Sequence, residues 1–319
     1  MIVPVIRALT KKYPELKVTV LTRAFFKPFF RDLPNVEVFF ANVNGEHKGI
    51  MGLYKLAKAL NKKQFYLVAD LHNVLRSKIL KKFISCKNFI SIDKGRNEKK
   101  LLTTGKLFKQ LKTTHQRYTQ VFGKLGYKID LSDPNFPKKN ELNLKLKNFI
   151  GDSSKKYIGI APFAAHEGKM YPLHLMKNVI EKLSKHYTII LFGGGKYESK
   201  ILNNYQDEFI NVISLAGKLS LDEEMDVISN LDVMLAMDSG NAHIAAMLGI
   251  KVITIWGVTH PYAGFTPFNQ PESYNLLPNR TKFPLIPTSV YGNKYPEEYR
   301  DVSGTITPET IIDKIKSVL

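Results

Sequence analysis

Apolar runs of strand length alternate with amphipathic segments of helical period along the whole chain, in two successive series. In the first series, strands are predicted at 17–22, 36–41, 65–71 and 89–92, and helices at 2–9, 25–34, 50–60, 74–84 and 113–126. In the second series, strands are predicted at 157–162, 188–193, 211–216, 233–237 and 251–256, and helices at 173–185, 198–205, 221–230, 242–248 and 308–318. Strands that alternate with helices in this order predict an α/β fold with parallel sheets.

The segment between the two series is rich in proline, polar residues and lysine. It reads DLSDPNFPKKN (130–140) and has the composition of a linker. A chain of 319 residues has room for two domains that each bury a core. We therefore predict domains at 1–150 and 151–319. The basic stretch DKGRNEKK (93–100) is interpreted as a loop of the first domain.

The chain shows no sign of export or of membrane insertion. No apolar run reaches the roughly 18 residues of a membrane span, and no charged segment precedes an apolar one at the start. The single cysteine, Cys86, excludes an internal disulfide and a cysteine-cluster metal site. These features predict a cytoplasmic protein.

Positive charge is concentrated in the first half of the chain. Residues 1–150 hold 31 Lys and Arg against 10 Asp and Glu, whereas residues 151–319 hold 16 against 18. The electrostatic field of so uneven a charge distribution favours an anionic partner. This partner would be a nucleic acid, an acidic membrane surface or a phosphorylated acceptor. The alternative is a solvated lysine-rich surface without a specific partner.

The turn after strand 233–237 has the chemistry of an anion site. It reads Asp238-Ser239-Gly240-Asn241 and is followed at once by a helix that carries His243. At the carboxyl end of a parallel strand, a helix start aims free N–H groups at a ligand. Gly240 lets an anion approach the backbone, His243 can donate to it, and Asp238 fixes the loop or meets a sugar hydroxyl. The alternative is an ordinary helix cap with a core histidine.

Two other loops of the second half follow carboxyl ends of strands. GGGKYE (193–198) is rich in glycine but lacks the spacing of a dinucleotide fingerprint or a P-loop. FAAHEGKMYP (163–172) places Lys169 before a helix, where a cation can meet a diphosphate. The three loops together predict one nucleotide site in the second half.

On the basis of these loops and of the segments around them, the sequence resembles glycosyltransferase family 9, the ADP-heptose:lipopolysaccharide heptosyltransferases. The resemblance is carried by PVIRALTKKYPELKVTVLTR (4–23), GKMYP (168–172), LFGGGKYE (191–198), LAGKLSLDE (215–223) and MDSGNAHIAAMLGIKVITIWGVTHP (237–261). It implies a GT-B fold, with two Rossmann-like domains facing a cleft. The acceptor-binding domain would be 1–150, and the nucleotide-sugar-binding domain would be 151–319.

The resemblance also implies the partners. The donor would be an ADP-sugar with heptose as the sugar, and the acceptor an anionic, phosphorylated glycolipid of the lipopolysaccharide core. The enzyme would then touch the acidic cytoplasmic face of the inner membrane and would need no metal, no cofactor and no nucleic acid.

Carried over position by position, the family's donor site falls on residues of the second half. Lys169 matches the lysine on the donor diphosphate, and Glu198 and Leu219 match positions at the ribose and the base. Around the diphosphate and sugar lie Asp238, Ser239, Gly240 and His243. The implied reaction is an inverting transfer, in which a general base activates an acceptor hydroxyl.

In one respect the sequence differs from the family that it resembles. Its members begin with a strand and a Gly-Asp loop ahead of the segment that opens this chain, so that strand and the aspartate usually assigned as base are expected to be missing. The catalytic base is therefore unknown. Asp70, at a strand's carboxyl end, is a candidate, and a helix cap or loop anchor is the alternative.

Two residues of the helix at 113–126, His115 and Arg117, are candidate acceptor-binding residues. Arg117 can meet a phosphate or carboxylate of the acceptor. The alternatives for Arg117 are an intrahelical ion pair or a solvated charge.

Three hypotheses on function follow. The first is a heptosyltransferase that uses an ADP-sugar, and the second is an inactive GT-B homologue that binds a nucleotide or an anionic glycolipid. The third, a nucleic-acid-binding protein, rests on net charge alone, because the sequence lacks RNA-binding aromatic motifs, helix-turn-helix signals and zinc ligands.

Overall fold

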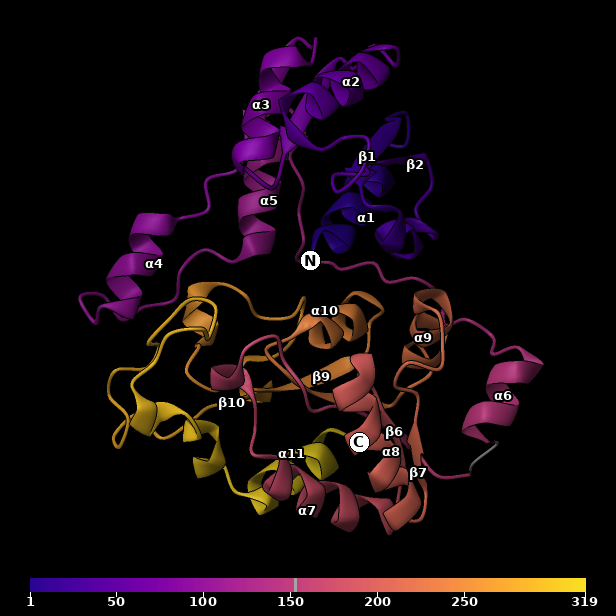
Figure 1. Cartoon of the computed structure of the whole chain (residues 1–319), viewed down its shortest axis with the longest axis vertical. Helices are drawn as coiled ribbons and strands as arrows, with labels where there is room; N and C mark the ends of the chain where they lie inside the picture. Colours follow the sequence, from indigo (N-terminus) through magenta and orange to yellow (C-terminus); the bar gives the residue numbers. More distant parts are fainter. Residues whose placement is uncertain (152–153) are drawn as a thin grey trace. The chain divides into compact units, whose positions relative to one another are not determined.

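The computed structural model describes residues 1–151 and 154–319, which form two compact units (Figure 1). The first unit comprises Met1–Arg96 and Lys112–Asn135, and the second comprises Asn97–Leu111 and Phe136–Leu319. Residues 97–111 and 136–150 therefore pack with the second unit, although they precede residue 150.

The second unit contains a six-stranded sheet in which every strand pair is parallel, as the alternating pattern predicts. The strand order is β10-β9-β8-β5-β6-β7. The strands are β5 (Tyr157–Ala161), β6 (Thr188–Leu191), β7 (Val212–Ser214), β8 (Val233–Met237), β9 (Lys251–Ile255) and β10 (Asn275–Leu276). Strand β10 was not predicted, because two residues are too short for a periodic signal.

The second unit also contains helices on both faces of this sheet and at its periphery (Figure 1). They are α4 (Arg96–Thr103), α6 (Leu144–Ile150), α7 (Leu173–Ser184), α8 (Gly195–Glu208), α9 (Leu221–Ile228), α10 (Gly240–Met247) and α11 (Pro308–Val318). Short 3₁₀ turns are η2 (Glu167–Lys169), η3 (Pro261–Ala263), η4 (Glu272–Tyr274), η5 (Glu297–Tyr299) and η6 (Val302–Thr305). Helix α10 lies on one side of β9, with α7 and α11 on the other (Figure 1). Every residue of β8 is buried, as expected for a central parallel strand.

The interpretation of residues 93–100 as a loop is wrong from Arg96 onward, where α4 begins. The helix gains an apolar face only by docking onto a distant part of the chain. Leu102 is 1% exposed within a cluster that includes Ala263, and the Lys99 ammonium lies 4.1 Å from the centre of the Phe265 ring. Because these partners lie some 160 residues away, local sequence gives no sign of them.

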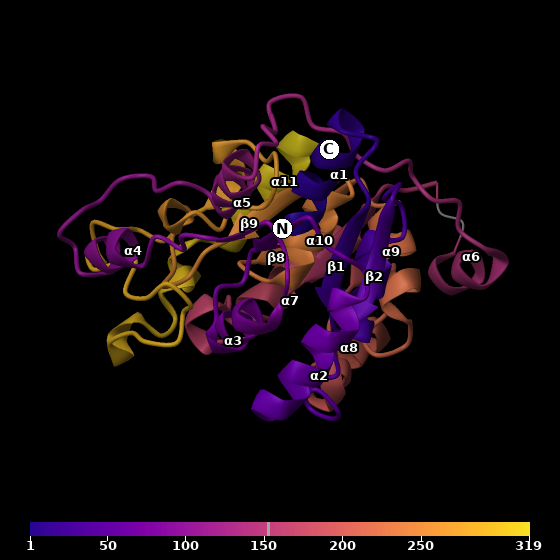
Figure 2. The same cartoon turned by 90° about the horizontal axis from the view of Figure 1, so that it is seen from above.

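The first unit holds two separate pairs of parallel strands. Strand β1 (Val18–Thr22) pairs with β2 (Val36–Phe40), and β3 (Leu67–Asp70) pairs with β4 (Asn88–Ser91). Figure 2 shows β1 and β2 side by side. Most of the residues of these strands are only half-buried, in contrast to those of the second unit.

The helices of the first unit form two layers. They are α1 (Ile2–Lys12), α2 (Gly49–Asn61), α3 (Leu75–Phe83) and α5 (Thr114–Lys124), with the 3₁₀ helix η1 (Ala24–Phe30). Helices α1 and α5 share a core with Val18 of β1 and Ala69 of β3, and so tie the two strand pairs together. Helices α2 and α3 pack around Leu56.

The helix predicted at 25–34 is the shorter η1, because Pro28 lacks the N–H that a regular α-helix needs.

Across the described residues, no helix has both the length and the apolar composition needed to cross a membrane.

Candidate active site

The candidate site lies at the carboxyl ends of β5 and β8. Strands β5 and β8 are neighbours, and the connection after β5 leads to β6 on one side whereas the connection after β8 leads to β9 on the other. The carboxyl ends of β5 and β8 therefore flank the topological switch point of the sheet, where open α/β folds bind their ligands. The loop 162–172 follows β5 and the turn 238–241 follows β8, which brings two of the three predicted loops together.

A buried ion pair joins these two loops. The Lys169 Nζ lies 2.9 Å from Asp238 Oδ2, and the two side chains are 15% and 7% exposed. Thr259, just beyond β9, donates its hydroxyl to the same carboxylate oxygen at 3.1 Å. Asp238 therefore links the ends of three adjacent parallel segments, and its alternative contact with a sugar hydroxyl stays a prediction.

The start of helix α10 lacks a side-chain cap. Ser239 is the N-cap residue, but its side chain makes no capping hydrogen bond. Its Oγ is buried and has no hydrogen-bond partner among the described residues. A Cβ built on Gly240 would meet no atom within 4 Å. Free N–H groups, an unpaired hydroxyl and open backbone beside a lysine are the features of an anion site.

The other predicted donor residues lie on neighbouring loops of the same unit. His243 is the fourth residue of α10 and is half-buried. Glu198, in the first turn of α8, accepts the N–H of Gly194 at 2.8 Å and thereby closes the glycine-rich loop. Leu219 is half-buried in the loop between β7 and α9. Their predicted contacts with sugar, ribose and base stay predictions.

Helix α9, which follows the Leu219 loop, carries a half-buried carboxyl group at Glu224. Burial raises its pKa from 4.5 to about 7. Between these values the folded state holds a proton that the unfolded state has released, so the free energy of unfolding falls as pH rises. We expect Glu224→Gln to remove this fall and to stabilise the protein above pH 7 by about 1 to 2 kcal/mol, because the half-buried group remains partly screened.

Urea unfolding at about pH 5 and about pH 8 measures this effect. An identical pH dependence in the wild type and in Glu224→Gln would contradict it.

Asp70, the candidate base, lies in the first unit at the end of β3. Its carboxylate is 7% exposed and accepts three hydrogen bonds. The donors are the backbone N–H groups of His72 and Asn73, at 3.0 and 2.8 Å, and the Ser91 hydroxyl at 3.0 Å. These bonds are those of a loop anchor, which was the alternative role.

His115 and Arg117 are buried in α5, with exposures of 5% and 3%. Burial and the nearby N-terminal amino group lower the pKa of His115 to about 3, so the imidazole is neutral. Arg117 donates to the Asp93 and Lys112 carbonyls, both at 3.3 Å, and a Cβ at Gly95 would lie 2.2 Å from its guanidinium. The alternative of a solvated charge is therefore wrong, because the guanidinium packs against the backbone of a loop that only the tertiary fold brings close.

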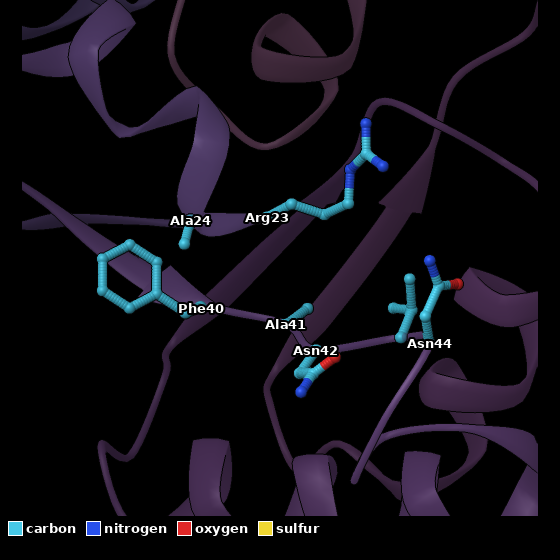
Figure 3. A pocket seen from close by; sticks show the side chains of 7 residues that line it. Arg23, Ala24, Phe40, Ala41, Asn42 and Asn44 are labelled. Atoms are coloured by element: carbon cyan, nitrogen blue, oxygen red, sulfur yellow. The ribbon is translucent and has the colours of Figure 1, made fainter. Parts of the chain in front are cut away.

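The first unit also contains a pocket that the sequence analysis did not identify. It lies at the carboxyl ends of β1 and β2, is open to the surface and has a volume of about 250 Å³. Figure 3 shows the Phe40 ring beside Ala24, with the Arg23 guanidinium and the Asn44 amide on the other side. Asn42 completes the polar lining. The carboxyl-edge rule used for the second unit would have found this pocket if applied to residues 23 and 42.

Thr259 is a second residue that the analysis missed, although it lies in the quoted stretch 237–261. It follows the carboxyl end of β9, next to β8 in the sheet, so strand order alone would have placed it beside Asp238. Within 1–151 and 154–319, no three His, Cys, Asp or Glu residues gather as a metal site would require.

Two parallel α/β units, with a candidate anion site at the switch point of the second, are the features of a glycosyltransferase of the GT-B class. Residues 53–284 match the sequence profile of glycosyltransferase family 9 (heptosyltransferase). The chain belongs to this family, which confirms the resemblance noted in the sequence.

Relatives and solved structures agree with this assignment. The lipooligosaccharide heptosyltransferase 2 of Campylobacter jejuni is 24% identical over 298 residues, covering 91% of this chain and 85% of the relative. The glycosyl transferase family 9 structure from Veillonella parvula has a TM-score of 0.73 at 16% identity, covering 99% of this chain and 92% of the other. The E. coli heptosyltransferase WaaC with ADP has a TM-score of 0.71 at 17% identity, covering 99% and 95%. The predicted fold class is confirmed.

Proposed function

We propose that this protein transfers a heptose from ADP-heptose to a sugar of a lipopolysaccharide or lipooligosaccharide core. Family membership and the names of its relatives support the reaction class. The observation that carries the proposal is the arrangement of Lys169, the unpaired Ser239 hydroxyl and the uncapped start of α10 at one switch point.

These groups match the charge that develops during the transfer. When the acceptor oxygen displaces the nucleoside diphosphate, negative charge grows on the leaving phosphate. A lysine ammonium, backbone N–H groups and the positive end of a helix dipole all stabilise this charge. In this proposal Glu198 and Leu219 hold the ribose and base, while Asp238 and His243 lie next to the sugar.

We assign the acceptor to the first unit, which corresponds to the role predicted for residues 1–150. The excess of positive charge in those residues suits a phosphorylated glycolipid and the acidic membrane surface that carries it. The pocket of the first unit combines an arginine, two amide side chains and an aromatic ring. Such a lining suits an anionic sugar, because amides bind hydroxyls and a guanidinium binds a phosphate or carboxylate.

The test is turnover. We would incubate the protein with ADP-heptose and a lipopolysaccharide core that lacks heptose, and follow both ADP release and the mass of the core. Release of ADP together with a core heavier by one heptose supports the proposal. Tight ADP binding with no transfer would instead support the inactive homologue.

A change at Arg23 tests the acceptor pocket separately. We expect Arg23→Ala to raise the KM for the core acceptor about 10-fold, the effect of one charge-assisted hydrogen bond, and to leave the Kd for ADP unchanged. Lys58→Ala, which removes an equal charge from an exposed position on α2, is the control. Equal acceptor KM values for the two variants would show that general charge, and not this pocket, attracts the acceptor.

A further inference from the structure

Three glycines from distant parts of the second unit pack against one another beside Lys169. A Cβ at Gly257, just after β9, would lie 2.2 Å from the Gly168 carbonyl oxygen. A Cβ at Gly168 would lie 2.7 Å from both the Gly292 carbonyl oxygen and the Tyr295 ring. The turn η2, which ends in Lys169, is therefore held between the segment after β9 and the tail loop 288–295, with no room for a side chain on either side.

The third glycine lies against the lysine itself. Gly292 has a φ of +78°, and a Cβ there would lie 2.3 Å from Lys169 Cγ and 2.7 Å from its Cδ. The methylene stem of Lys169 thus runs along the bare backbone of Gly292 before its ammonium reaches Asp238. Because packed atoms cannot overlap, the backbone at residue 292 sets the path of this side chain.

Hydrogen bonds hold the tail loop in place against the segment that follows β9 and within itself. The Thr288 N–H donates to the Val258 carbonyl at 3.0 Å, and the Thr288 hydroxyl donates to the Lys294 carbonyl at 2.8 Å. The Gly292 N–H donates to the buried Ser289 hydroxyl at 2.7 Å. The opposite side of η2 is fixed as well, because the Val258 N–H donates to the Gly168 carbonyl at 2.7 Å.

We propose that the tail loop 288–295 determines where the Lys169 ammonium lies, and that Gly292 is a positioning residue for the donor diphosphate. This inference rests on the proposed role of Lys169 in binding the donor. It gives a function to a part of the tail in which the sequence shows little periodicity. A side chain at residue 292 would push the lysine stem away from its path, and the ammonium would leave the switch point while the fold remains.

The experiment is a double-mutant cycle on ADP affinity, measured by calorimetric titration. We expect Gly292→Ala to weaken ADP binding about 10-fold, and to have less than about a twofold effect when Lys169 is already alanine, because residues that act through one group are not additive. The matched control is Gly105→Ala. Gly105 has a φ of +71° and no atom within 4 Å of its Cβ position, so this change brings the same backbone strain without touching a neighbour.

Ser289→Ala provides a milder variant if Gly292→Ala folds poorly. It removes the acceptor of the Gly292 N–H, and we expect a loss of about threefold in ADP affinity that again disappears in the Lys169→Ala background. Equal ADP affinity in Gly292→Ala and Gly105→Ala, or a loss that persists without Lys169, would overturn the positioning role. If Lys169→Ala alone leaves ADP binding intact, the proposed donor site itself is wrong.

Discussion

Lys169→Ala is expected to weaken ADP binding about 100-fold, the largest functional effect that we predict. A charge-assisted bond to phosphate contributes about 1.5 to 3 kcal/mol, and each 1.4 kcal/mol corresponds to a factor of ten in affinity. The variant also leaves Asp238, 7% exposed, without its cation and close to the expected diphosphate. Repulsion between the two anions adds to the lost attraction. Calorimetric titration of ADP measures the effect.

Two further variants separate the causes of this loss of ADP affinity. Lys185→Ala removes an equal charge at the C-terminal end of α7, which is the end remote from the carboxyl edge of the sheet, and should bind ADP like the wild type. The double variant Lys169→Ala/Asp238→Ala removes the repelling carboxylate, so it should recover part of the lost affinity. Unchanged ADP affinity in Lys169→Ala would contradict the diphosphate role of this lysine.

Asp238→Ala is expected to lower the free energy of unfolding by about 3 kcal/mol, the largest effect on stability that we predict. Removing one partner of a buried ion pair leaves the other charge without compensation in a poorly solvated place. Here the remaining cation is Lys169, 15% exposed, and the Thr259 hydroxyl loses its acceptor as well. Urea unfolding gives the change in free energy from the midpoint at constant slope.

The matched control is Glu208→Ala. Glu208 pairs with Lys177 at 2.7 Å, but the two side chains are 48% and 41% exposed. Exposed pairs contribute no more than about 1 kcal/mol, so this variant should lie close to the wild type. Asp238→Asn should lie between the two, because the amide oxygen can still accept from Thr259. If Asp238→Ala and Glu208→Ala lower the free energy of unfolding equally, the Lys169–Asp238 ion pair contributes no more to stability than an exposed pair does.

Local sequence patterns were sufficient for most of the fold. The buried run 233–237 and the β-branched run 251–255 are strands, and the short apolar helix predicted between them at 242–248 is present, although it starts two residues earlier, at Gly240. The pattern failed where an element depends on distant contacts. Helix α4 looks like a basic loop, because its two buried residues find their partners some 160 residues away.

The candidate site shows the same division. The sequence by itself determined the parallel α/β class, the family and the three loops that carry Lys169, Glu198 and Asp238, because these depend on hydrophobic period and on short motifs. Only the tertiary structure decided which side chains meet. Lys169 forms an ion pair with Asp238 because β5 and β8 are neighbours at the switch point. Arg117 donates to the backbone of a loop because the fold buries its side chain. Strand order and long-range packing set these contacts, and neither is encoded in any local stretch of the chain.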